Sequence, residues 1–197
     1  QEGGGCLFDL GVYNIVTLTG WLGPVQRVTA LTGTAIPRRE VEGEMMDVEV
    51  EDNAHVLLDF GDAVFAVVTT GFTMQKSRGI TIELYGTEGT IQLPGYDWAP
   101  EGYEMWQNSA GNWQVFLETD RQWPWTDGIR HTVACIQSGQ SPIITAEHGL
   151  HTLEIMVKAK EAGADGRARE IKSRFDPPTF ELPDAETSHQ LDHNPSR

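Results

Sequence analysis

The feature that most restricts the fold is the alternation of apolar and polar residues from Val48 to Phe60. The apolar positions share one side of an extended chain: Val48, Val50, Ala54, Val56, Leu58 and Phe60. The polar positions share the other side: Glu49, Glu51, Asn53, His55 and Asp59. A period of two is typical of a strand with one buried face. Gly61-Asp62 then predicts a hairpin turn, and residues 64–72 predict the returning strand.

Further predicted strands lie on both sides of this hairpin. Residues 28–36 alternate in the same way, and residues 80–84 predict a strand that turns through Gly86–Gly89 into residues 90–93. The aromatic stretch 96–125 predicts short strands and loops. Because consecutive strands are joined by short turns, we expect a mainly antiparallel sheet.

Three segments predict helices. After the glycine run Gly3–Gly5, residues 7–22 place apolar side chains around most of a helix, which should therefore be buried from more than one side. Two later helices are predicted, one from Thr126 or Asp127 to about Ser138 and one from Thr145 towards Gly163. Each has a predicted apolar side, formed in the first by Ile129, Val133 and Ile136, and in the second by Leu150, Leu153, Ile155, Met156 and Ala159. The pattern predicts an α+β fold, with an open, mainly antiparallel sheet and helices packed on one face. The other face, partly apolar, would be available to a partner subunit in a homo-oligomer.

The chain divides into one predicted domain and a tail. Residues 1–175 are long and apolar enough to bury a core. Residues 176–197 are rich in proline and polar residues, which predicts an extended or disordered C-terminal tail.

Charge and cysteine content exclude several classes of partner. The net charge of −15 argues against nucleic acid and anionic membranes, because both require basic patches. No apolar run approaches the length of a membrane span. The opening residues Gln-Glu-Gly-Gly-Gly lack the pattern of a signal peptide, so we expect no secretory leader. Cys6 and Cys135 have no metal-binding spacing, so we expect free buried thiols in a reducing cytoplasm. His148 and His151 lie three apart beside glutamates but lack the His-Glu-x-x-His spacing, so no metal is predicted.

Four segments resemble a known family. Residues 3–13, Gly-Gly-Gly-Cys-Leu-Phe-Asp-Leu-Gly-Val-Tyr, are similar to the Gly-Gly-Gly-x-Leu-x-Asp-x-Gly-x-His/Tyr motif of the Gfo/Idh/MocA oxidoreductases. This family includes glucose–fructose oxidoreductase, inositol dehydrogenase and dihydrodiol dehydrogenase. Glu51–Ala54, Ile82–Thr90 and Ser141–His148 resemble later family segments in the same order. The resemblance extends over about residues 3–167.

The resemblance implies the substrate-side, sheet-forming domain of an NAD(P)-dependent oxidoreductase. In such enzymes a preceding Rossmann domain carries a glycine-rich fingerprint and a catalytic lysine in a Lys-Pro motif, and this sequence has neither. NAD or NADP would be bound mainly by that missing N-terminal domain, so this chain alone should be inactive. The implied substrate is a sugar, polyol or related alcohol. The alternatives are a non-catalytic carbohydrate-binding module or a dimerisation module that works with a separate Rossmann subunit.

Asp9 and Tyr13 are the predicted catalytic residues. Their spacing of four places both side chains on one face of the first helix. Hydride transfer to or from an alcohol carbon requires a base or acid for the hydroxyl proton. A tyrosine can serve when a nearby cation lowers its pKa, and the resemblance supplies that cation as the lysine of the missing domain. The alternative is that Asp9 caps the helix and Tyr13 packs as a core aromatic.

Three further residues are weaker candidates for substrate binding. His131 lies on the helix that begins near Thr126, where the resemblance allows a position facing the cleft, although a surface or capping role is the alternative. Lys76 and Arg78 follow the returning strand and could reach a substrate. The tryptophan-rich stretch could stack on a sugar ring, pack against the sheet or contact a subunit.

Overall fold

An open four-stranded sheet with the order β12-β1-β4-β5 forms the base of the molecule in the computed structural model. The structure describes residues 3–74, 76, 79–96, 99–116 and 126–179. All neighbouring strands in this sheet are antiparallel, and Val56 pairs with Ala30 on one side and Val68 on the other. The strands are β1 (Arg27–Gly33), β4 (Asn53–Gly61), β5 (Val64–Gly71) and β12 (Arg169–Glu170).

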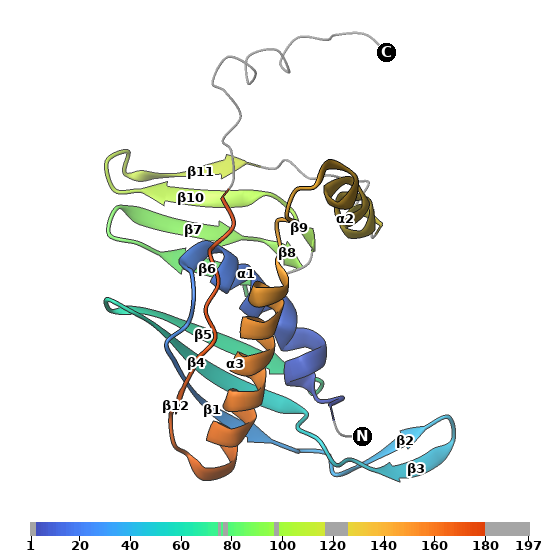
Figure 1. Cartoon of the computed structure of the whole chain (residues 1–197). Helices are drawn as coiled ribbons and strands as arrows, with labels where there is room; N and C mark the ends of the chain where they lie inside the picture. Colours follow the sequence, from blue (N-terminus) through green and yellow to red (C-terminus); the bar gives the residue numbers. More distant parts are fainter. Residues whose placement is uncertain (1–2, 75, 77–78, 97–98, 117–125, 180–197) are drawn as a thin grey trace, which may run out of the picture.

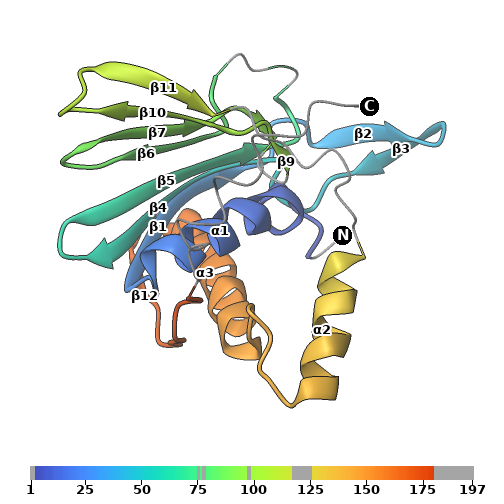
Figure 2. The same cartoon turned by 90° about the horizontal axis from the view of Figure 1, so that it is seen from above.

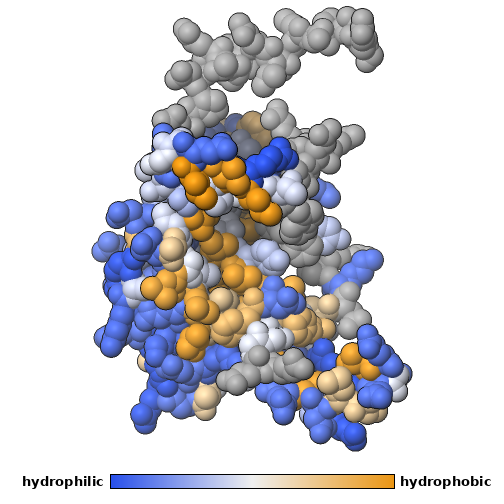
Figure 3. Space-filling model, turned by 45° about the vertical axis from the view of Figure 1, so that its right-hand side comes forward, coloured by the Kyte–Doolittle hydropathy of each residue, from blue (hydrophilic) through white to orange (hydrophobic). Residues whose placement is uncertain are grey.

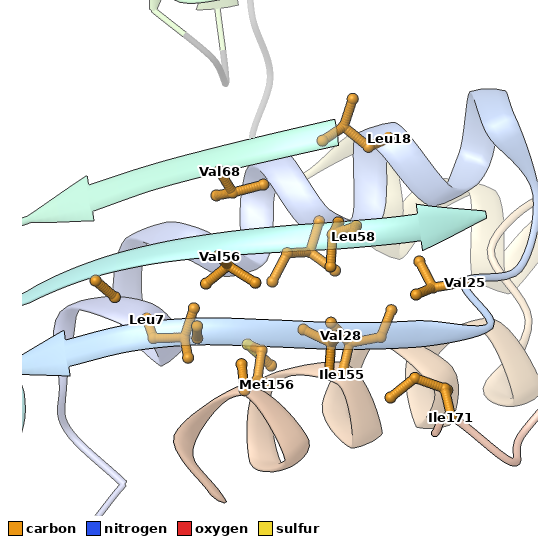
Figure 4. Packing of buried hydrophobic residues seen from close by; sticks show 14 of the residues in the cluster. Leu7, Leu18, Val25, Val28, Val56, Leu58, Val68, Ile155, Met156 and Ile171 are labelled. Carbon is orange, nitrogen blue, oxygen red and sulfur yellow. The ribbon is translucent and has the colours of Figure 1, made fainter. Parts of the chain in front are cut away.

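Helices cover one face of this sheet (Figures 1 and 2). The first is a continuous helix that opens with the π-turn η1 (Leu7–Gly11) and continues as α1 (Val12–Leu22). The second is α3 (Ala146–Asp165), whose Thr145 cap accepts a hydrogen bond from the His148 amide at 3.2 Å. The core between sheet and helices contains alternate strand residues and α3 residues (Figure 4): Val28, Val56, Leu58, Val68, Ile155 and Met156.

A second antiparallel sheet with the order β11-β10-β7-β6 lies beside β5 (Figure 2). Its strands are β6 (Ile82–Tyr85), β7 (Gly89–Leu93), β10 (Tyr103–Gln107) and β11 (Asn112–Phe116). Two short hairpins complete the strands, β2 (Arg38–Val41) with β3 (Glu44–Asp47), and β8 (Gly95–Tyr96) with β9 (Ala99–Pro100). The β2–β3 hairpin projects from the body as an arm (Figure 1).

The fold class predicted from the sequence is confirmed, because helices and open antiparallel sheets occur in one α+β unit. The residues that the structure describes contain no Rossmann domain. The two cysteines are free and buried, as expected. Within the described residues, no helix is both long and apolar enough to cross a membrane. Of the predicted tail, the structure describes only residues 176–179.

Three details differ from the sequence-based expectation. Val48 and Val50 precede β4, which begins only at Asn53, and Glu51 is buried instead of lying on a polar face. The helix α2 (Asp127–Ser138) lies apart from the first sheet (Figure 2), and its predicted apolar stripe is exposed: Ile129, Val133 and Ile136. In α3 the residues that face the core include two histidines, whereas Leu150 and Leu153 are exposed.

Candidate active site

The start of the first helix is fixed against β5. The Cys6 thiol contacts the carbonyl oxygen of Thr70 at 3.7 Å, and the Thr70 hydroxyl donates to the carbonyl of Cys6 at 3.2 Å. Gly11 allows close approach, because a Cβ there would lie 3.0 Å from Leu7 and 3.5 Å from the Thr70 methyl group. The helix opens with the widened η1 turn at this position, and such π-turns occur frequently at functional sites.

Glu51 lies beneath the N-terminal end of this helix. Its backbone carbonyl accepts a hydrogen bond from the Cys6 amide at 3.2 Å, and its carboxylate lies where a Cβ of residue 5 would be. Lys160 of α3 is the cationic partner, with Nζ 3.5 Å from the carboxylate. A side chain at residue 5 would have to displace this carboxylate, so the close packing favours the third glycine of the run.

The neighbouring Asp52 is a buried acceptor that joins the strands and the arm. Its carboxylate accepts hydrogen bonds from the amides of Ala35 at 2.7 Å and Ile36 at 2.9 Å, and from Arg39 at 2.8 Å. Burial alone would raise its pKa, but these donors, with the Asn53 side chain, hold the pKa well below its usual range. Asp52 is therefore a fixed anion with a structural role.

The same environment makes Cys6 unreactive. Burial, together with the carboxylates of Glu51 and Asp52, raises the pKa of the Cys6 thiol to about 11. Since the thiolate is the nucleophile, this cysteine is not a candidate for catalysis.

Asp9 and Tyr13 lie together on the outer side of the first helix. Both side chains are exposed, Tyr13 to 37%, whereas Leu7, Gly11 and Ile15 on the opposite side are buried. In the described part of the chain, the Asp9 carboxylate has no hydrogen-bond or ionic partner. The helix thus presents a carboxylate and a phenol to the outside, one turn apart, and neither lies in the core.

A groove of about 1250 Å³ runs beside this helix, between β5 and the second sheet. Helix residues Leu10, Asn14, Leu18 and Leu22 line one side of it. Asp9 and Tyr13 do not line the groove, although they directly precede Leu10 and Asn14. In the space-filling view, one face of the molecule carries a hollowed band of hydrophobic side chains (Figure 3). The groove can therefore hold apolar surface next to the pair.

The structure describes two of the other predicted site residues, Lys76 and His131. Lys76 is exposed, in the connection whose Met74 and Gly79 line the groove. Arg78 lies outside the described residues. His131 on α2 is half-buried, and its Nε2 accepts a hydrogen bond from the amide of Ile143 at 3.0 Å. This bond ties α2 to the segment before α3.

Sequence reasoning missed the supporting residues Glu51 and Asp52 and the groove residue Asn14. Glu51 was assigned to the polar strand face because it continues an alternating pattern, whereas Asp52 was given no place on either face. The available clue was that two adjacent acids interrupt this pattern just before the strand. Asn14 follows Tyr13 directly, and no sequence feature distinguished it.

The start of the first helix does not fit the pyrophosphate of a dinucleotide. The helix that follows the glycine run begins against the Glu51 carboxylate, whose charge disfavours a pyrophosphate there. Among the described residues, no three His, Cys, Asp or Glu side chains are grouped as metal ligands.

Comparison with known proteins supports the family resemblance. Residues 1–92 match the family model of the GFO/IDH/MocA C-terminal domain. No curated protein matches the chain.

Several solved oxidoreductases share the fold. An oxidoreductase from Agrobacterium radiobacter, in complex with NAD+, L-tartaric acid and magnesium, is 21% identical with a TM-score of 0.68, over 84% of this chain and 48% of its own. An NAD-binding oxidoreductase from Klebsiella pneumoniae is 18% identical with a TM-score of 0.72, over 85% of this chain and 50% of its own. Levoglucosan dehydrogenase in complex with NADH and L-sorbose is 16% identical with a TM-score of 0.72, over 85% and 50%. The chain therefore spans about half the length of these proteins.

Proposed function

On the premise that residues 1–92 carry the pattern of the Gfo/Idh/MocA C-terminal domain, we propose that this chain is the substrate-side part of an NAD(P)-dependent oxidoreductase. The observation that supports this most directly is the shared outer face of Asp9 and Tyr13 at the π-turn. The substrate is a sugar, polyol or related alcohol. The chain alone is inactive in this proposal, because the residues that bind the cofactor phosphates belong to another domain.

Tyr13 is the proposed acid/base and Asp9 its helper. The nicotinamide, when bound, supplies the acceptor or donor of the hydride. The Tyr13 hydroxyl takes the proton from the substrate hydroxyl in oxidation and returns it in reduction. The Asp9 carboxylate, one turn away, accepts a hydrogen bond from a second substrate hydroxyl and so orients the reacting carbon.

The groove beside the helix supports the choice of a polyhydroxy substrate. Its lining includes Asn14, Gln107 and Trp106, residues that combine hydrogen-bonding and aromatic side chains. Among proteins of this fold, levoglucosan dehydrogenase is known in complex with L-sorbose, which is itself a sugar.

The proposal is tested by expressing the chain alone and together with the coding sequence upstream of Gln1. Reduction of NAD+ and NADP+ is measured with a panel of sugars and polyols. We expect activity only in the longer protein, and Tyr13→Phe should lower kcat there by about two orders of magnitude or more, as for loss of a general acid/base.

Tyr103→Phe is the matched control, since Tyr103 is 40% exposed but lies on β10, where it stacks on Phe116 at 4.6 Å. It should leave kcat unchanged. Equal kcat values for Tyr13→Phe and the unaltered enzyme would remove Tyr13 from the chemistry. Activity of the isolated chain would contradict its expected inactivity.

A dimerisation role is a second candidate, favoured by the open face of the first sheet. Four large apolar side chains are exposed there, on the face opposite the helices: Leu31, Leu57, Phe65 and Val67. We propose that this face joins two copies of the chain, whether or not the domain also takes part in catalysis. Exposed apolar patches of this kind mark protein interfaces.

A further inference from the structure

The segment after α3, residues 169–179, forms a strap along that helix (Figure 1). It begins with β12, which pairs with β1, and continues with the Ile171 amide donating to the carbonyl of Gln26 at 2.9 Å. Two residues of the strap, Ile171 and Phe175, have buried side chains. We propose that this strap is a latch that acid releases, with His148 and His151 of α3 as its pH-sensitive contacts. The proposal is independent of the proposed enzymatic function.

The imidazole of His151 is hydrogen-bonded to the strap in its neutral, singly protonated form. The Val25 amide donates to His151 Nε2 at 2.9 Å, so this nitrogen carries a lone pair. The proton is therefore on Nδ1, which donates to the Ser173 carbonyl at 3.1 Å and lies 3.0 Å from the Ser173 hydroxyl oxygen. A second proton would have to enter at Nε2, directly against the Val25 N–H. Charging His151 thus breaks the bond to Val25 while the ring remains completely buried.

His148 is also neutral, with the opposite tautomer. The Thr19 hydroxyl donates to the carbonyl of Ile15 at 2.8 Å, so its oxygen accepts from His148 Nε2 at 2.8 Å. The other nitrogen, Nδ1, is buried without a hydrogen-bond partner among the described residues. A second proton there would have no acceptor. The ring stacks on Phe175 of the strap, with centroids 4.0 Å apart and planes 4° apart.

The surroundings of the two rings lower the pKa of both imidazoles, which favours their neutral forms in the bound strap. Burial lowers the pKa of both imidazoles below the usual 6.5. For His151, the charges of Arg174 on the strap and His148 on α3 lower the pKa further, whereas the Ser173 hydrogen bond and the Glu154 carboxylate raise it without reversing the shift. On the α1 side, His148 bonds to the uncharged Thr19.

The sign of the pH dependence follows from these shifts. A released strap exposes the imidazoles, which regain a pKa near 6.5, so the released state binds more protons than the bound state. The strap is therefore fully bound above pH 6.5 and loses stability as pH falls below 6.5. At pH 5.5, each histidine that stays neutral in the bound state favours release by up to about tenfold.

Glu154 provides an internal reference that does not titrate in this range. Its carboxylate accepts hydrogen bonds from the amides of Lys172 at 3.0 Å and Ser173 at 2.8 Å. Burial raises its pKa, but the bonds from Ser173 and Lys172 outweigh burial and hold the pKa below 4.5. Glu154 stays ionised at pH 5.5, so loss of protection at these two amides reports on the histidines.

Release of the strap would uncover the C-terminal end of the helix that carries Asp9 and Tyr13. Pro177 and Pro178 lie over α1, within 3.6 Å and 3.9 Å of the positions that Cβ atoms of Gly23 and Gly20 would occupy. Release of the strap at low pH therefore exposes this end of α1, whereas the hydrogen bond between Thr70 and Cys6 at the start of the helix remains.

The experiment is hydrogen exchange of the full 197-residue chain at pH 7.5 and 5.5, with rates normalised to the intrinsic rate at each pH. We expect the amides of residues 171–173 to lose protection by about tenfold or more at pH 5.5, whereas those of β4 keep theirs. Equal protection at both pH values would overturn the latch. A simultaneous loss in β4 would also overturn it, because the event would then be global unfolding.

The matched variant combines His151→Asn and His148→Gln, whose amide groups keep a donor near each former donor nitrogen but do not titrate. Its strap protection should not change between pH 7.5 and 5.5, and a change as large as in the unaltered chain would contradict the proposal. If the variant does not fold, proton NMR titration of the unaltered chain decides the question. Imidazole pKa values at or above 6.5 for both residues would overturn the latch.

Discussion

The two faces of the first sheet come from the same strands but have different surroundings. On the covered face, Val56 and Leu58 of β4 are buried against helices, and Asp52 just before the strand is fully hydrogen-bonded. On the open face, the alternate residue Leu57 is 50% exposed and Val67 opposite it is 66% exposed. Stability should therefore reside in the covered side, whereas the open side is available for association.

The largest expected contrast is between two aspartates that each pair with an arginine. Asp52→Ala removes a buried acceptor and leaves two amides and Arg39 without their carboxylate, which should cost about 3–5 kcal/mol of unfolding free energy. Asp47→Ala breaks the exposed pair with Arg38 and should cause no measurable loss. Urea unfolding measures both, and similar values would contradict the assigned role of Asp52.

The stabilising role of the Asp52 carboxylate should also be visible in the pH dependence of the unfolding free energy. Because the pKa of folded Asp52 lies below the usual 3.8, its contribution is complete above pH 3.8 and disappears as pH falls through the folded pKa. Unfolding free energies measured between pH 5 and pH 2 should therefore fall less steeply in Asp52→Ala than in the unaltered chain. Parallel curves would contradict this.

Adjacent leucines of β4 give the next contrast. Leu58→Ala leaves a cavity on the covered face, which should cost about 2–5 kcal/mol. Leu57→Ala, one residue away on the open face, should change the stability of the monomer by about 0.5 kcal/mol or less. Both are measured by urea unfolding at low protein concentration, and equal losses would show that the open face is covered in the monomer.

Two glycines of α3 should respond to alanine with opposite signs. Gly149 is exposed, and a Cβ there meets no atom within 4 Å, so Gly149→Ala should stabilise the chain by about 0.5–1 kcal/mol. A Cβ at Gly163 would lie 3.1 Å from Thr32 Cβ and closer still to its branches, so Gly163→Ala should destabilise by about 1–3 kcal/mol. Thermal unfolding compares the two, and stabilisation by both variants would contradict the close packing of α3 on β1.

Part of this contrast could be predicted from sequence, because alternation in β4 identifies Val56, Leu58 and Phe60 as inward residues, whereas β5 is apolar from Val64 to Val68 without alternation. The sequence also placed Asp9 and Tyr13 on one helical face, since a spacing of four fixes this whatever surrounds the helix. The π-turn could not be predicted, because it depends on the contacts of Cys6 and Gly11 with β5.

Burial of polar residues was the main failure of prediction. The pattern in α3 favoured Leu150 and Leu153 as core residues, yet His148 and His151 are buried because partners distant in sequence bond to both nitrogens of His151 and to Nε2 of His148. Glu51 is buried for a similar reason, since Lys160 lies near its carboxylate. Such pairings become visible only in the folded chain.

The smallest effect on the folded monomer should come from a charge on the open face. Leu57→Glu places a carboxylate in the patch formed with Leu31, Phe65 and Val67, where solvent hydrates it in the monomer but association would bury it. We therefore expect monomer stability to change little, whereas a dimer formed by the unaltered chain should dissociate. Light scattering after size exclusion measures the mass, with Tyr85→Glu as control, because Tyr85 is 74% exposed on the second sheet. An unaltered chain that stays monomeric at high concentration, or a Leu57→Glu chain that stays dimeric, would show that the open face does not join two copies.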